Sequence, residues 1–190
     1  MSSRALDDPV LERRRLAALA EIRQIGDPVL RAPALTITTF DDVLRDEVER
    51  MTAIMNEARG VGLAAPQVGS LRRLAVVLTG EDAPPLALCN PEITWRSEEQ
   101  EYDYEGCLSI GEISVEVPRA VAIRVTAQDV EGQTFEIAPE GFAARVIQRQ
   151  GAEKWKADPP IGQTVGAGPA LRVAVDQPLA SGPVGVGLVA

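Results

Sequence analysis

Between residues 41 and 59, hydrophobic residues recur at every third or fourth position. These positions share one face of a helix because an α-helix turns once every 3.6 residues. They are Leu44, Val48, Met51 and Met55. Thr39 or Asp41 can cap the start of this helix, and Gly60 can end it. The pattern therefore predicts an amphipathic helix over residues 41–59.

Shorter apolar runs follow the helix. Those at residues 74–78 and 86–88 are bounded by Gly or Pro and predict strands. Alternating apolar residues on both sides of Glu131-Gly132 predict a hairpin, and these are Val121, Ile123, Val125, Phe135 and Ile137.

A second helix is predicted from about Pro139, with Phe142, Val146 and Ile147 on its buried side. The order of helix, short antiparallel strands and helix predicts an α+β domain rather than a doubly wound one.

Composition divides the chain near residue 150. The first 150 residues hold 9 Gly and 9 Pro, whereas the last 40 hold 7 Gly and 5 Pro. Segments this rich in Gly and Pro lack a core of their own. We therefore predict a Gly- and Pro-rich tail over residues 151–190 that is loosely ordered over residues 161–190 and can still add an edge strand near residues 171–175. An N-terminal helical extension over residues 1–21 precedes the domain at residues 22–150.

The charge balance and two residue counts limit the function. A net charge of −9 over 190 residues argues against a nucleic-acid partner, since such binding needs clustered Lys and Arg. The basic run at residues 13–15 is interpreted as the solvated face of the N-terminal helix. Two cysteines are too few for a disulfide framework, and the longest apolar stretch near the N-terminus is too short for a signal peptide or membrane span. We therefore expect a cytoplasmic protein with no membrane partner, and one whose lack of histidine excludes His-based catalysis.

Two short motifs could carry chemistry. Residues 60–69 read GVGLAAPQVG and join the end of a helix to a strand, and on their own they fit a helix cap and turn as well as a ligand loop. Residues 105–110 read EGCLSI and contain Cys107, which taken singly is more often a small buried residue than a ligand or nucleophile. A cysteine nucleophile would need a neighbouring base, usually His.

Together, the two motifs resemble those of the peptide deformylase family. The resemblance is collinear over residues 22–148 and includes further matches, which are IGDPVLR at 25–31, NPE at 90–92, VPRA at 117–120 and AARVIQ at 143–148. It implies a fold in which short antiparallel strands surround a central C-terminal helix.

The resemblance also implies an activity: metal-dependent removal of the formyl group from the N-terminal methionine of nascent peptides at the ribosome. By this resemblance Cys107 is a ligand to Fe(II) or Zn(II), while Gln67 and the backbone N–H of Leu108 stabilise the oxyanion. Val61 would line the methionine pocket and Gly62 would offer its backbone to the peptide.

The family's third motif, His-Glu-x-x-His, is missing. It should supply two metal ligands and a general base on the second helix, but residues 149–153 read RQGAE. Arg149 would place a cation where the metal should lie, and rescue by Glu153 would still leave too few ligands. We therefore expect the metal to bind poorly or not at all and the chain to be inactive.

This loss falls at the same residue as the change in composition. One hypothesis is that the reading frame changes at about codon 149, so that the tail is not the family's own C-terminus. The alternative is a divergent homologue, including one that binds methionyl peptide N-termini without cutting them. The frameshift hypothesis fails if the other frames after codon 148 encode no His-Glu-x-x-His.

Overall fold

The computed structural model describes residues 8–151 and 172–174. Its helices are α1 (Pro9–Ala20), α2 (Asp42–Glu57), α3 (Gly141–Arg149) and two 3-10 turns, η2 (Pro28–Arg31) and η3 (Ala65–Val68). The strands of this part are β1 (Gly62–Ala64), β2 (Leu74–Val77), β3 (Leu86–Arg96), β4 (Gln100–Cys107), β5 (Gly111–Ala120), β6 (Ile123–Gln128), β7 (Thr134–Ile137) and β8 (Arg172–Ala174). This mixture of helices with antiparallel strands is the predicted α+β class.

The strands form two sheets. One has the order β1-β2-β3-β6-β7, and the other has the order β4-β5-β8. The predicted hairpin is β6–β7, in which Val125 lies opposite Ile137 and Ala127 lies opposite Phe135. The predicted edge strand is β8, which pairs with β5 through the register Val115↔Val173.

Two strands of the smaller sheet, β4 and β5, were not predicted. The side chains of β4 are mostly polar and exposed as far as Tyr104, so no buried apolar face marks this strand in the sequence. Strand β3 is also longer than the apolar run at residues 86–88, because its second half alternates between buried and exposed positions. Its pairing with β6 contains register shifts between Cys89 and Trp95.

Helix α2 agrees with its predicted pattern except at its end. Asp41 caps it by accepting a hydrogen bond from the Leu44 N–H at 3.0 Å. At the other end, the left-handed conformation belongs to Arg59, with φ 58°, and not to Gly60 as predicted. Gly60 lies close to the core instead: a Cβ there would be 3.1 Å from Cδ1 of Leu108, so the leucine side chain would have to shift slightly.

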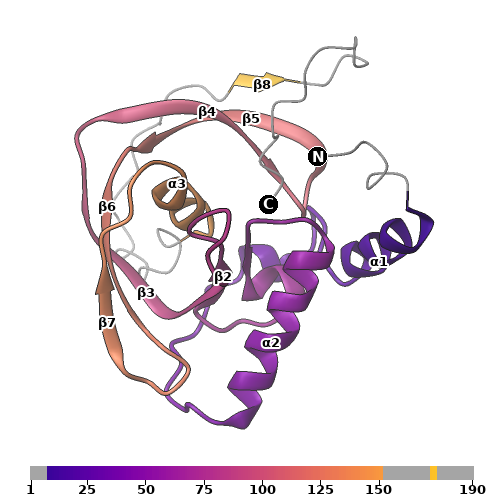
Figure 1. Cartoon of the computed structure of the whole chain (residues 1–190), viewed down its shortest axis with the longest axis horizontal. Coiled ribbons are helices and arrows are strands. Elements are labelled where there is room, and N and C mark those ends of the chain that lie inside the picture. Colours follow the sequence, from indigo (N-terminus) through magenta and orange to yellow (C-terminus); the bar gives the residue numbers. More distant parts are fainter. Residues whose placement is uncertain (1–7, 152–171, 175–190) are drawn as a thin grey trace.

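Helix α3 lies inside the barrel-like curl of the two sheets, with β4 and β5 on one side and β3 and β6 on another (Figure 1). Five consecutive residues from Ala144 to Gln148 are buried, which matches the predicted central helix. The prediction for Phe142 is wrong: its side chain is 41% exposed, because it lies in the first turn at the end of the sheets. Helix α3 ends at Arg149, and Gly151 follows with φ 82°.

Helix α1 packs against α2, as Figure 1 shows at the edge of the molecule. Ala18 of α1 and Ile22 just after it enter the core that α2 also lines. An ion pair joins Arg50 to Glu21 at 2.6 Å. Of the basic run at residues 13–15, Arg13 and Arg14 are exposed as predicted for a solvated face, whereas Arg15 is half-buried. Within the described residues, none of the helices has the length and apolar character that crossing a membrane requires.

Candidate functional site

The two motifs of the sequence meet through Gln67. Its side-chain N–H group donates to Oγ of Ser109 at 3.2 Å and to Sγ of Cys107 at 3.8 Å. Its Oε1 accepts from the Ala64 N–H at 2.9 Å, which fixes the orientation of the amide. Gln67 and Cys107 are 40 positions apart in the sequence, and direct contact between η3 and the end of β4 brings them together.

The chain segment after α1 holds the two motif loops together. The Arg23 N–H donates to the Gln67 carbonyl at 2.7 Å, and the Ile25 N–H donates to the Ser109 carbonyl at 2.7 Å. Gln24 adds a side-chain hydrogen bond to the Leu108 carbonyl at 3.3 Å. These three neighbouring residues therefore hold both loops in place, and Ile25 also lines the cavity between them.

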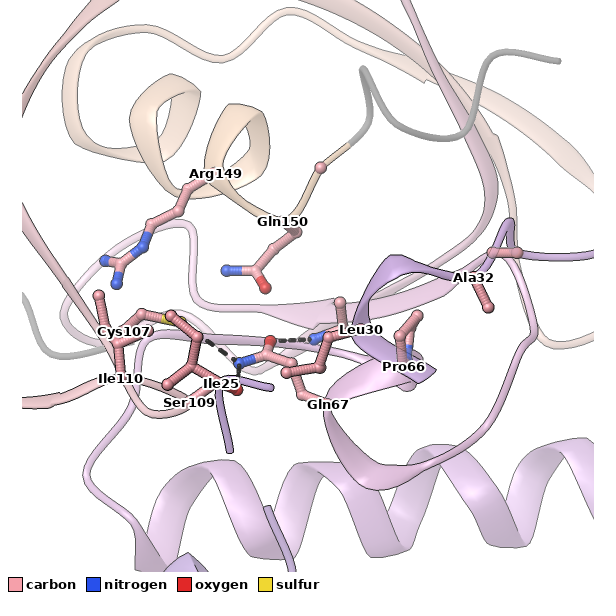
Figure 2. Close-up of a pocket in the computed structure, with 13 residues that line it drawn as sticks. Ile25, Leu30, Ala32, Pro66, Gln67, Cys107, Ser109, Ile110, Arg149 and Gln150 are labelled. Atoms are coloured by element: carbon pink, nitrogen blue, oxygen red, sulfur yellow. Dashed lines mark hydrogen bonds between the residues drawn. The ribbon is translucent and has the colours of Figure 1, made fainter. Parts of the chain in front are cut away.

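A cavity of about 260 Å³ lies between these loops and the end of α3. Figure 2 shows Arg149 and Gln150 pointing from the end of α3 toward the side of the cavity formed by Cys107 and Gln67. The described residues that line it are Ile25, Leu30, Ala32, Ala34, Ala64, Pro66, Gln67, Cys107, Ser109, Ile110, Arg149, Gln150 and Gly151.

Gln67 and Cys107 are the predicted site residues that line this cavity. Leu108 is buried in the core beside α2, and Val61 packs against the second core cluster, so neither lines it. Gly62 is covered: a Cβ at this position would collide with the side-chain amide of Gln150 and approach Cγ1 of Val146 to 3.2 Å. Of the predicted site residues, the structure therefore brings one from each motif into the cavity and places the other three outside its lining.

A buried ion network fixes α3 against β4 and β5. Glu105 accepts two hydrogen bonds from Arg119, at 3.0 and 2.9 Å, and one from Arg145 of α3 at 3.0 Å. Arg145 also donates to the carbonyl of Glu101 at 2.8 Å. Because Glu105 precedes Cys107 by two residues, this network sets where the end of α3 lies relative to the cysteine.

Arg149 gives the cavity its charge. Burial lowers the pKa of its guanidinium below the ordinary value, while interactions with Cys107 and Glu105 act in the opposite direction. An arginine stays protonated in proteins despite such shifts. A fixed positive charge is therefore present beside Cys107.

The residues at this site do not fit Fe(II) or Zn(II). Among the described residues, no three His, Cys, Asp or Glu side chains gather closely enough to hold a metal ion. Catalytic zinc sites use about three protein ligands, and a neighbouring guanidinium repels a divalent cation. Glu153, which was considered as a replacement ligand, lies outside the described residues.

The two cysteines differ sharply in accessibility. Cys89 is fully buried on β3, and burial raises the pKa of its thiol to about 11 from an ordinary value of 9.0. At pH 8 about 0.1% of it is thiolate, the form that reacts with alkylating reagents. Because this pKa is raised, folding disfavours ionisation of Cys89. The stability that comes from keeping the Cys89 thiol protonated in the folded state is complete below pH 9. It is lost as pH rises from 9 through about 11.

We expect iodoacetamide at pH 8 to modify the native protein once, at Cys107, because Cys107 borders the cavity while Cys89 is buried. Peptide mass spectrometry would locate the adduct, and unfolding in guanidinium chloride should add the second. The variant Cys107→Ser serves as the control and should remain unmodified while folded. Rapid modification of Cys89 in the native protein would contradict this arrangement.

Sequence reasoning missed part of the cavity. Ser109 stood inside a motif already singled out, but only the fold shows that its hydroxyl bonds Gln67. Ile25 and Leu30 belong to the family match at residues 25–31, which gave the available signal for them. Gln150 stands in the segment RQGAE, which the sequence marked only by its missing ligands, whereas the structure shows it as a buried part of the cavity wall.

Comparison with known proteins agrees with the fold and motifs. The family model described as Polypeptide deformylase matches residues 19–151. A peptide deformylase from Thermotoga petrophila is 47% identical over 129 residues, covering 68% of this chain and 77% of the relative. One from Dictyoglomus thermophilum is 42% identical over 132 residues, covering 70% of this chain and 84% of the relative.

Solved structures give the same result. The crystal structure of peptide deformylase from Thermotoga maritima superposes with a TM-score of 0.67 at 45% identity, covering 70% of this chain and 89% of that one. A peptide deformylase structure from Legionella pneumophila gives 0.66 at 36% identity, with 70% and 79% covered. By sequence and by fold, the chain belongs to the polypeptide deformylase family.

Proposed function

We propose that this chain is a deformylase-family protein that retains the family's peptide cleft but does not hydrolyse formyl groups. The observation that supports this most directly is the guanidinium of Arg149 in the cavity that Cys107 lines. A cation in this place opposes binding of Fe(II) or Zn(II). Cys107 could supply one metal ligand, whereas catalytic sites use about three. The family's metal-dependent chemistry therefore has no support in the described residues.

Without a metal, the described residues of the cavity supply neither an activated water nor a general base. Free water has a pKa of about 15.7, so it gives very little hydroxide at neutral pH unless a metal acidifies it. The amide of Gln150 does not accept a proton near neutral pH, and the described residues of the cavity lining include no carboxylate or imidazole. Gln67 still presents an amide, the kind of group that stabilises an oxyanion, but stabilisation alone does not start the reaction.

A second candidate is a non-catalytic binder of methionyl N-termini. Strand β1 favours it, because β1 is an edge strand of its sheet, paired with β2 on one side. An extended peptide can add to such an edge through backbone hydrogen bonds. We propose nascent peptide N-termini in the cytoplasm as the partners of such a binder.

Purified protein is expected to show no turnover of a formyl-Met tripeptide after incubation with Fe(II), Ni(II) or Zn(II). Formate release measures turnover, and elemental analysis after desalting measures bound metal, which should be well below one ion per chain. Hydrolysis that a chelator abolishes would overturn the proposal.

Calorimetric titration with the same formyl-Met tripeptide separates the two candidates. Heat of binding without formate release supports a binder, whereas neither binding nor release supports a chain that has lost the function entirely. The variant Gly62→Ala provides a matched test, because its added Cβ displaces Gln150 next to β1. A binder that uses the edge of β1 should lose affinity in this variant.

A further inference from the structure

An open groove of about 300 Å³ lies between α1 and α2. Figure 1 shows this pair of helices at the edge of the molecule, on the side opposite β6 and β7. The described linings of the groove and of the cavity beside Cys107 share no residue, so the two are distinct. The described residues that line the groove are Arg14, Ala17, Ala18 and Glu21 of α1 and Arg50, Ala53, Ile54 and Glu57 of α2.

The apolar part of this lining consists mostly of small side chains. Ala17 and Ala53 are exposed, whereas Ala18 and Ile54 are buried and belong to the core. Val10 is 48% exposed and extends the apolar surface along α1, since positions 10, 14 and 17 share one face of a helix. Small side chains let other helices approach closely, because the distance between packed helices depends on the side chains at the contact.

Four charged side chains border the groove in an alternating arrangement. At one end Arg14 pairs with Glu57 at 3.6 Å, and at the other end Arg50 pairs with Glu21 at 2.6 Å. Each helix therefore contributes one arginine and one glutamate, and the two arginines lie at diagonal corners. The four side chains are 40% to 62% exposed, so each has room for a second partner.

This arrangement of charges is complementary to itself. With a twofold axis along the groove, Arg14 of one copy would face Glu57 of another, and the same axis would bring Arg50 opposite Glu21. With the axis across the groove, these two arginines would face Glu21 and Glu57, respectively. Each arginine meets a glutamate in both cases, and a twofold contact that uses the same patch of both copies is the commonest kind in oligomers.

We propose that the face formed by α1 and α2 binds a second copy of this chain, giving a twofold dimer. The two helix pairs pack as a four-helix bundle in which neighbouring helices are antiparallel. Covering the apolar lining of the groove on both copies stabilises the dimer, and the surrounding charges set its register.

The net charge of the chain opposes this association. Each copy carries −9, but at physiological ionic strength charges more than about 8 Å apart are largely screened. The described lining of the groove holds two arginines and two glutamates and is therefore neutral. The contacts at this face thus decide whether two copies associate.

Sedimentation equilibrium of the full chain tests the inference. The average mass should rise from that of one chain toward that of two as the protein concentration increases. The variant Ala53→Glu places a charged side chain in the groove and should weaken association about tenfold or more. The matched control Ala20→Glu should leave it unchanged, because Ala20 is exposed on α1 without lining the groove. Thermal melting followed by circular dichroism would establish that both variants are folded.

A chain that stays monomeric at every concentration would overturn the inference, as would association that Ala53→Glu leaves unchanged. A charge-inverted variant tests the complementarity while keeping both ion pairs within the chain. It combines Arg14→Glu, Glu21→Arg, Arg50→Glu and Glu57→Arg.

The charge-inverted variant should still associate with itself but not with the parent chain, because like charges would then meet across the face. Native mass spectrometry of the variant mixed with isotopically labelled parent protein would count the mixed dimers. Statistical mixing of the two chains, or a variant that no longer associates with itself, would contradict the proposed contact. The measurement does not depend on metal or turnover, so its failure is distinguishable from failure of the proposed function.

Discussion

Replacing Glu105 with Gln is expected to lower the free energy of unfolding by about 3–5 kcal/mol, because the change leaves one buried and one half-buried guanidinium group without their shared counter-ion. Glu105 is 5% exposed, and it accepts from Arg119 and from Arg145, which is 4% exposed. For a chain of this length, the loss corresponds to a fall in melting temperature of about 6–20 °C. Urea unfolding monitored by circular dichroism would measure it.

The matched control is Glu101→Gln. Glu101 faces the same arginine, with its carboxylate 3.9 Å from Arg145, but its side chain is 67% exposed. Exposed ion pairs contribute about 0–1 kcal/mol, so this variant should remain close to the parent protein. Equal effects of the two substitutions would show that the network at Glu105 does not hold α3 in place.

Ile147→Ala is expected to destabilise the fold by about 2–5 kcal/mol, because it leaves a cavity at the centre of the second core cluster. Ile147 is 1% exposed and belongs to the cluster that joins α3 to β2, β3 and β6. Thermal and urea unfolding would both report the change. The loss should also weaken the support of Arg149 and Gln150, which follow it at the end of α3.

Phe142→Ala on the same helix is the control for Ile147→Ala. This substitution removes a larger side chain, but Phe142 is 41% exposed. Truncating it should therefore cost much less than truncating Ile147. A larger effect at Phe142 would mean that the helix face is assigned incorrectly.

The end of α3 bears on the two explanations for the missing motif. The family match extends to residue 151, and the helix ends at Arg149, so one of the five positions expected to read His-Glu-x-x-His is helical within the described residues. Two histidines spaced by four residues need a continuous helix to share one face. Both a shifted frame and divergence remain compatible with this geometry, and the nucleotide sequence decides between them.

Several elements could be predicted because local physical signals are strong. Helix α2 follows from the periodic spacing of Leu44, Met51 and Met55, and the β6–β7 hairpin follows from alternation around Glu131-Gly132. Strands β4 and β5 pair with each other as neighbours in sequence, but they could not be predicted in this way because the side chains of β4 are mostly polar and exposed, so no apolar alternation marks the strand. The exposure of Phe142 likewise depends on where α3 enters the sheets, which periodicity does not specify.

The sequence by itself determined the family and the damage to its third motif, because motif residues and missing ligands are visible without coordinates. Only the tertiary structure decided that Gln67, Ser109 and Cys107 form one hydrogen-bonded group and that Arg149 and Gln150 line the same cavity. These residues come from segments 40 or more positions apart. Their meeting depends on sheet pairing and on the buried Glu105 network, which are long-range interactions that no local pattern encodes.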